Sequence, residues 1–184
     1  MAAFNTLDWT RLDVWAIVSM DGIAVVEPKH QEACLAWLRT HGHAVSTIDF
    51  LQGIGPAVIA FGELFRWKEQ FGYALGPESR ILDALRDGFE FDVQPGRGVV
   101  LELMNAGVAY NENPSWFAGL LSIAREHSRV QLALGARFFT LLILSPCSAL
   151  VGTAYEKVSV PSPFRTAARH GDPFSGHDET RPPE

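Results

Sequence analysis

The first third of the chain places short apolar runs on either side of turn residues. Runs at 15–19 and 23–26 flank Asp21-Gly22, and this dipeptide is typical of a tight turn between two β-strands. Pro28 suits the first turn of a helix, and Gly42 suits the position just past a helix end. The apolar residues between them form one stripe. The pattern therefore predicts a strand pair followed by a helix.

The middle of the chain predicts two strands with helices between them. A short strand is expected at 44–50, and Gly53-Ile54-Gly55-Pro56 opens a helix whose apolar spacing continues to about Phe71. After a glycine-containing loop, a second helix is expected from about Glu78 to Asp87, where Gly88 ends it. Beta-branched residues then begin a strand at 99–103.

The last predicted helix and strand complete an alternating pattern. Asn111 or Asn113 can cap a helix with Pro114 in its first turn, and apolar positions from 116 to 124 form its buried face. Residues 138–144 are apolar on both faces, as expected of a central buried strand. Strands alternating with helices predict an α/β fold with a mostly parallel sheet covered by helices.

The pattern divides the chain into three parts. Residues 1–42 form an N-terminal extension, the strand pair plus helix, that packs on the core, and residues 43–160 form the main domain. Residues 161–184 contain five prolines and only two large apolar side chains, Phe164 and Phe174. Such a segment buries too little surface to offset its ordering entropy, so we expect a flexible tail.

Charge and composition limit the cellular compartments and the classes of partner that are expected for this chain. The chain has 21 acidic and 15 basic residues, a net charge of -6, which repels phosphate backbones and anionic lipids and attracts basic proteins. The longest nearly uninterrupted apolar stretch, Phe138 to Leu144, has seven residues, far short of the ~20 that a membrane span needs. With no signal-peptide pattern and only Cys34 and Cys147, the chain is expected to be cytoplasmic, binding neither nucleic acid nor membrane.

The glycine pairs fit ordinary turns better than a nucleotide site. Gly53-Ile54-Gly55 is followed by Pro56, which removes an amide that a phosphate cradle would use. Gly96-Arg97-Gly98 leads into a strand, whereas a phosphate loop leaves a strand and opens a helix.

Metal and catalytic patterns are also missing from the sequence. His41 and His43 have no further ligand at metal-binding spacing, and Cys147 resembles no thiol-enzyme context. His127 is expected near a helix C-terminus, where the dipole favours a cation. The sequence thus predicts no catalytic residues, no metal and no cofactor.

The most unusual segment is acidic. Residues 78–92 contain five acids and two bases, and Asp83 and Asp87 lie on one helix face. Like charges at this spacing cost a helix ~0.2–0.5 kcal/mol, and the dipole disfavours an anion such as Asp87 at a helix C-terminus. One interpretation is a solvated face relieved by Arg80 and Arg86. The other is a preorganised acidic surface for a basic cleft.

The same segment resembles a known family. Leu82-Asp83-Ala84-Leu85-x-Asp87 is similar to the L-D-A-L-x-D helix of the barstar family, which inhibits secreted bacterial ribonucleases. An aromatic-glycine loop at 71–73, an aromatic-acidic pair at 89–91 and a strand around 100–103 occur in matching order, so the resemblance covers roughly residues 43–145. The acidic residue that the family uses early in its third helix falls near Ala118, so that contact is expected to be absent.

The resemblance implies an immunity protein that occludes the basic active site of a toxin, most simply a ribonuclease. Asp83 and Asp87 would mimic two phosphates there, and aromatic anchors would flank them. The implied partner-binding residues are Asp83, Asp87, Tyr73, Phe89, Arg86 and Glu90. Two alternatives stay open: an interaction or regulatory module that kept the barstar fold without a toxin partner, and an enzyme whose site the sequence does not reveal.

Overall fold

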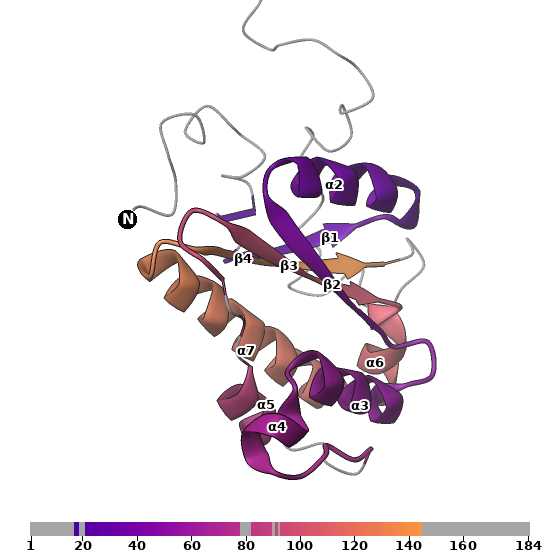
Figure 1. The fold of residues 1–184 in the computed structure, drawn as a ribbon. Coiled ribbons are helices and arrows are strands. Elements are labelled where there is room, and N and C mark those ends of the chain that lie inside the picture. Colours follow the sequence, from indigo (N-terminus) through magenta and orange to yellow (C-terminus); the bar gives the residue numbers. More distant parts are fainter. Residues whose placement is uncertain (1–16, 19–20, 78–81, 90, 92, 145–184) are drawn as a thin grey trace, which may run out of the picture.

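The fold is a four-stranded parallel sheet between two layers of helices (Figure 1). The computed structural model describes residues 17–18, 21–77, 82–89, 91 and 93–144. The elements in chain order are β1 (Ile23–Val26), α2 (Pro28–Thr40), β2 (His43–Asp49), α3 (Ile54–Leu64), α4 (Trp67–Phe71), α5 (Leu82–Gly88), β3 (Gly98–Met104), α6 (Ala106–Glu112), α7 (Pro114–Ala133) and β4 (Arg137–Ile143). The predicted α/β class is therefore confirmed.

The sheet has the strand order β1-β4-β3-β2, with every neighbouring pair parallel. β4 is buried along its whole length, as expected of the strand that is apolar on both faces. β2 pairs with β3 over seven consecutive positions, from His43 opposite Gly98 to Asp49 opposite Met104. The three predicted strands of the main domain thus occur, each within one residue of its expected start.

Each face of the sheet carries its own apolar core. α2 covers one face, where Leu35 and Leu38 pack with Phe139 and Leu141 of β4. The helices α3 to α7 cover the other face and enclose the larger core, which includes Phe50, Phe61, Phe117 and Phe138. Figure 1 shows these two layers on opposite sides of the strands. The N-terminal β1–α2 unit therefore shares the sheet of the main domain.

The predicted N-terminal strand pair is wrong. Ile17 and Val18 are helical, and β1 pairs in parallel with β4. Asp21 and Gly22 have φ angles of 56° and 77°, and the N–H of Gly22 donates to the carbonyl of Ile17 over 2.9 Å. Left-handed residues of this kind close a hairpin or end a helix equally well, and here they end a helix.

The helix predicted to open at Gly53-Ile54-Gly55-Pro56 and to continue to about Phe71 is divided into α3 and α4. Arg66 adopts a left-handed conformation with φ of 52°, which ends the first helix and starts the second in a new direction. The break turns Trp67 into the core, where it is 1% exposed. The short helix α6 was not predicted at all.

Asn113 caps α7 as the sequence suggests, since its side-chain oxygen accepts a hydrogen bond from the N–H of Trp116 over 3.0 Å. No helix in the described part of the chain is long and apolar enough to cross a membrane. The predicted tail at 161–184 lies outside the described residues, so its expected flexibility stays a prediction.

Candidate functional site

The acidic helix α5 is held against the rest of the molecule by its apolar side. Leu85 is fully buried, and Leu82 packs beside Gly119 of α7. At its end, Gly88 lies against the ring of Trp67, so closely that an added Cβ would fall 1.9 Å from ring atom Cζ3. Only glycine allows this approach. The contact fixes α5 between α4 and α7.

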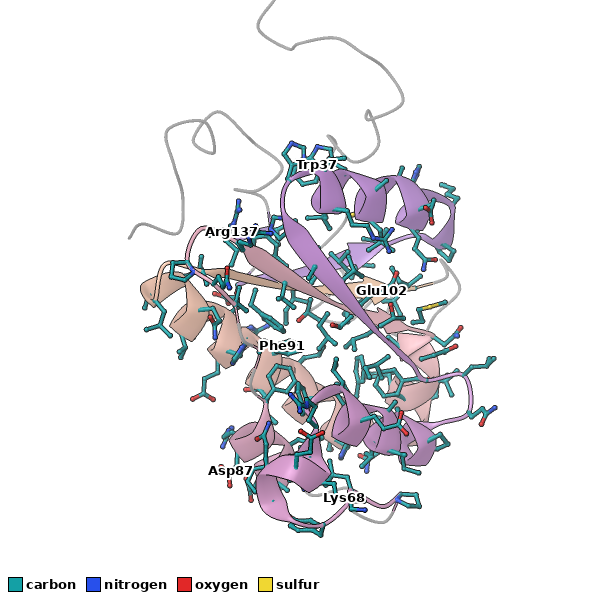
Figure 2. All side chains as sticks on the ribbon, viewed as in Figure 1. Trp37, Lys68, Asp87, Phe91, Glu102 and Arg137 are labelled. Atoms are coloured by element: carbon teal, nitrogen blue, oxygen red, sulfur yellow. The ribbon has the colours of Figure 1, made fainter. Side chains whose placement is uncertain are left out.

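The two aspartates of α5 are exposed. The side chains of Asp83 and Asp87 are both exposed, and neither makes a hydrogen bond or ion pair to the described part of the chain. Figure 2 shows Asp87 at the outer side of the molecule. The helix thus presents two exposed carboxylates, one turn apart and without a partner among the described residues, on a backbone that its buried side holds in place.

An aromatic group continues the surface beyond α5. Tyr73 is 53% exposed and Phe71 is 41% exposed. Their rings contact Trp67, with ring centroids 6.2 Å and 4.3 Å from it. Because the same tryptophan supports Gly88, the aromatic residues and the end of the acidic helix share one support. We call Asp83, Asp87, Phe71 and Tyr73 the acidic–aromatic surface.

Phe89 does not belong to this surface, which corrects the sequence-based expectation. Its side chain is only 5% exposed and packs among Phe65, Phe91 and Phe138. An aromatic residue just after an exposed helix can turn inward, and here the large core under the sheet accepts it. Glu90 lies outside the described residues.

Arg86 forms an ion pair with another residue of the same chain. Its Nε lies 3.6 Å from Oε2 of Glu126 on α7, and both side chains are more than half exposed. Exposed pairs of this kind contribute ~0–1 kcal/mol, so the pair can open easily. Sequence reasoning missed Glu126 because only the packing of α5 against α7 places this carboxylate beside the acidic helix.

The structure also corrects the interpretation of His127. The residue lies well before the end of α7 at Ala133. Its ring packs on Phe138 and Phe89, with centroids 4.8 Å and 5.4 Å away. Burial lowers the pKa of His127 from its usual 6.5 to about 4. The ring is therefore neutral near pH 7, and attraction to the helix dipole does not explain it.

The other sequence candidates have structural partners. Nδ1 of His41 lies 2.7 Å from the carbonyl of Trp37, and Nδ1 of His43 lies 3.2 Å from that of Leu38. At the Gly53–Pro56 turn, Oε2 of Glu112 accepts a hydrogen bond from the N–H of Ile54 over 2.7 Å. A carboxylate of the chain itself thus occupies the helix start where a phosphate would bind.

In the part of the chain that the structure describes, no three acidic, histidine or cysteine side chains gather as a metal site. Cys34 is buried on the inner side of α2, and Cys147 lies outside the described residues. No protein-family model, curated protein or solved structure matches this chain.

Proposed function

We propose that this protein is a non-catalytic, barstar-like immunity protein. It binds a basic protein toxin, most simply a secreted ribonuclease, and occludes the toxin's active site with the acidic–aromatic surface. The observation that carries this proposal is the pair of exposed carboxylates on α5, which have no partner among the described residues. The helix is anchored by Leu85 and by the contact of Gly88 with Trp67.

The chemistry of a nuclease site supports the assignment. Such a site must hold phosphate groups and is therefore basic. The carboxylates of Asp83 and Asp87 can accept charge-assisted hydrogen bonds from arginine, lysine or protonated histidine there, in place of phosphate oxygens. The helix is already anchored, so little ordering entropy opposes binding. The net charge of -6 also speeds the encounter with a basic partner.

Aromatic side chains at the border of the acidic helix supply apolar contact. Tyrosine is among the residue types that carry most interface energy, and Tyr73 is well exposed beside the end of α5. Glu126 adds a third carboxylate on the α7 side, once Arg86 turns toward the partner. Phe89 supports the surface from below and does not contact the partner.

The order of elements from β2 to β4 is consistent with the resemblance. Three parallel strands alternate with helices, and the acidic helix comes directly before the second of these strands. An immunity protein of this kind protects the producing cell before the toxin is exported. We therefore place it in the cytoplasm, where it would bind neither nucleic acid nor membrane.

The proposal predicts that a gene for a secreted ribonuclease lies beside this one, and inhibition of that enzyme tests it. Asp83→Ala and Asp87→Ala should each weaken inhibition by ~2–5 kcal/mol, because truncation leaves a buried charge of the toxin unpaired. Glu32→Ala is the matched control, since Glu32 is an exposed carboxylate on α2, across the sheet. Equal inhibition by the wild type and all three variants would show that the toxin binds elsewhere on the protein. No inhibition by the wild type would favour the alternative of an interaction module without a toxin partner.

A further inference from the structure

β2 forms an edge of the sheet that no other described strand covers. β1 and β2 are the two edge strands, and β2 pairs only with β3 among the described strands. Its seven residues run without a bulge, and the five central ones are uncharged and contain neither lysine nor proline. Natural proteins usually place a bulge, a charged residue or a proline on such an edge, which prevents it from pairing with another strand. Figure 1 shows β2 crossing the front of the molecule.

Charge differs between the two ends of β2. Arg39 and Arg97 are exposed at its amino end, where Arg97 precedes the residue that pairs with His43. Asp49 and Glu112 are exposed at its carboxyl end. A second β2 added antiparallel would bring basic residues opposite acidic residues at both ends. A parallel addition would bring like charges together.

The two ends of β2 also differ in shape, with a protruding side chain at one end and a hollow at the other. Leu51, just past the carboxyl end of β2, is 65% exposed. At the amino end a hollow of about 410 Å³ is lined by Gly42, Ala44 and Arg97, among others. If β2 pairs with its own copy over its full length, Ser46 lies on the two-fold axis and Leu51 falls opposite His41, beside this hollow.

We propose that two copies of the protein associate through β2, antiparallel, to form a dimer with one continuous sheet. A two-fold interface uses the same surface twice, so each charge and shape match occurs twice. The association is independent of the proposed inhibition. α5 contacts α7 and Trp67 and takes no part in this edge, so the dimer leaves the acidic–aromatic surface accessible.

Sedimentation equilibrium of the full chain tests the association. The average mass should rise with concentration from 20.3 kDa toward twice that value. Arg39→Glu with Arg97→Glu should weaken dimerisation at least tenfold, whereas Arg39→Lys with Arg97→Lys should preserve it. A mass that stays at 20.3 kDa up to millimolar concentration would overturn the proposal.

Disulfide trapping tests the geometry. In a Cys147→Ser background, Ser46→Cys should form a covalent dimer on mild oxidation with diamide, because directly opposed antiparallel residues have Cβ atoms ~4.5–5.5 Å apart. Ala44→Cys is the control: Ala44 faces Ile48 of the other copy, which leaves the two introduced thiols ~13 Å apart. Equal trapping of both variants, or of neither, would contradict this dimer.

Discussion

The carboxylates of Glu102 and of the α5 aspartates lie in opposite environments. Glu102, on β3 beneath α2, is 3% exposed. Its two oxygens accept hydrogen bonds from Gln31 over 2.8 Å and from Thr47 over 2.7 Å. Figure 2 labels Glu102 in the interior and Asp87 at the outer side of the molecule. Asp83 and Asp87 are exposed and unpartnered in the described structure.

The difference separates a carboxylate that stabilises the fold from carboxylates that are available to another molecule. Glu102 joins α2 to two strands, so its hydrogen-bonding capacity is used within the chain. The α5 pair costs the helix a small repulsion and gains nothing within the described structure. A repulsive pair kept on an anchored helix is what a binding surface for a cationic partner requires.

The largest expected effect on stability comes from disrupting the contact between Gly88 and Trp67, which holds the helix of Asp83 and Asp87 in place. Gly88→Val drives a side chain into the Trp67 ring, and we expect a loss of about 3 kcal/mol in the free energy of unfolding. Asp87→Val is the control, because it adds the same side chain one residue earlier, on the exposed side. Urea unfolding of both measures the difference, and equal losses would show that the Gly88–Trp67 contact does not anchor α5.

Removing the buried carboxylate should destabilise the protein without affecting binding. Glu102→Ala leaves the donors of Gln31 and Thr47 without their acceptor, at a cost of about 2–3 kcal/mol in the free energy of unfolding. Toxin affinity, measured below the unfolding transition, should match the wild type. A weakened complex would mean that the two carboxylate environments are coupled.

Low pH should destabilise the fold through protonation of His127. Its pKa is lowered in the folded state, so the unfolded chain binds more protons between pH 6.5 and about 4. The contribution of the neutral His127 ring to the free energy of unfolding is therefore fully present above pH 6.5. It is lost as the pH falls through this window. We expect a loss of about 2 kcal/mol, reduced from the full shift because the ring is partly exposed.

His127→Phe is the control for this pH dependence, because phenylalanine keeps the ring packing and removes the titration. Unfolding of both proteins at pH 7 and pH 4 isolates the effect. If the wild type and the variant lose equal stability, the acid sensitivity arises elsewhere.

The smallest expected effect is on the stability of α5 itself. Asp83→Ala and Asp87→Ala should each change the free energy of unfolding by less than ~0.5 kcal/mol, because both side chains are exposed. Relief of the like-charge repulsion favours a slight gain. Thermal unfolding measures this change. A loss above ~1 kcal/mol would place these residues with Glu102 as structural carboxylates.

The sequence predicted the positions of the strands β1 to β4 and of most of the helices. Runs apolar on both faces predicted β4, and Pro28, Gly42 and Asn113 marked helix ends correctly. Asp21-Gly22 misled because left-handed residues end helices as well as hairpins. The break at Arg66 was missed because arginine has no preference for the left-handed region, and core packing of Trp67 imposes it.

The sequence predicted the exposed positions of Asp83 and Asp87 on α5 but not the contacts around this helix. Spacing alone placed Asp83 and Asp87 together on an exposed face. The burial of Phe89, the proximity of Glu126 to Arg86 and the neutral state of His127 all depend on contacts between distant segments. Local sequence does not encode such contacts.

Calorimetric titration of the cognate toxin that the proposal predicts, a secreted ribonuclease, into three proteins tests the central claim most directly. The proteins are the wild type, the Asp83→Ala, Asp87→Ala double variant and Glu102→Gln. We predict that the double variant loses at least ~4 kcal/mol of binding free energy, about a thousandfold in affinity, while Glu102→Gln binds as the wild type does. Wild-type affinity in the double variant would contradict the account, because the acidic helix would then be only a solvated face.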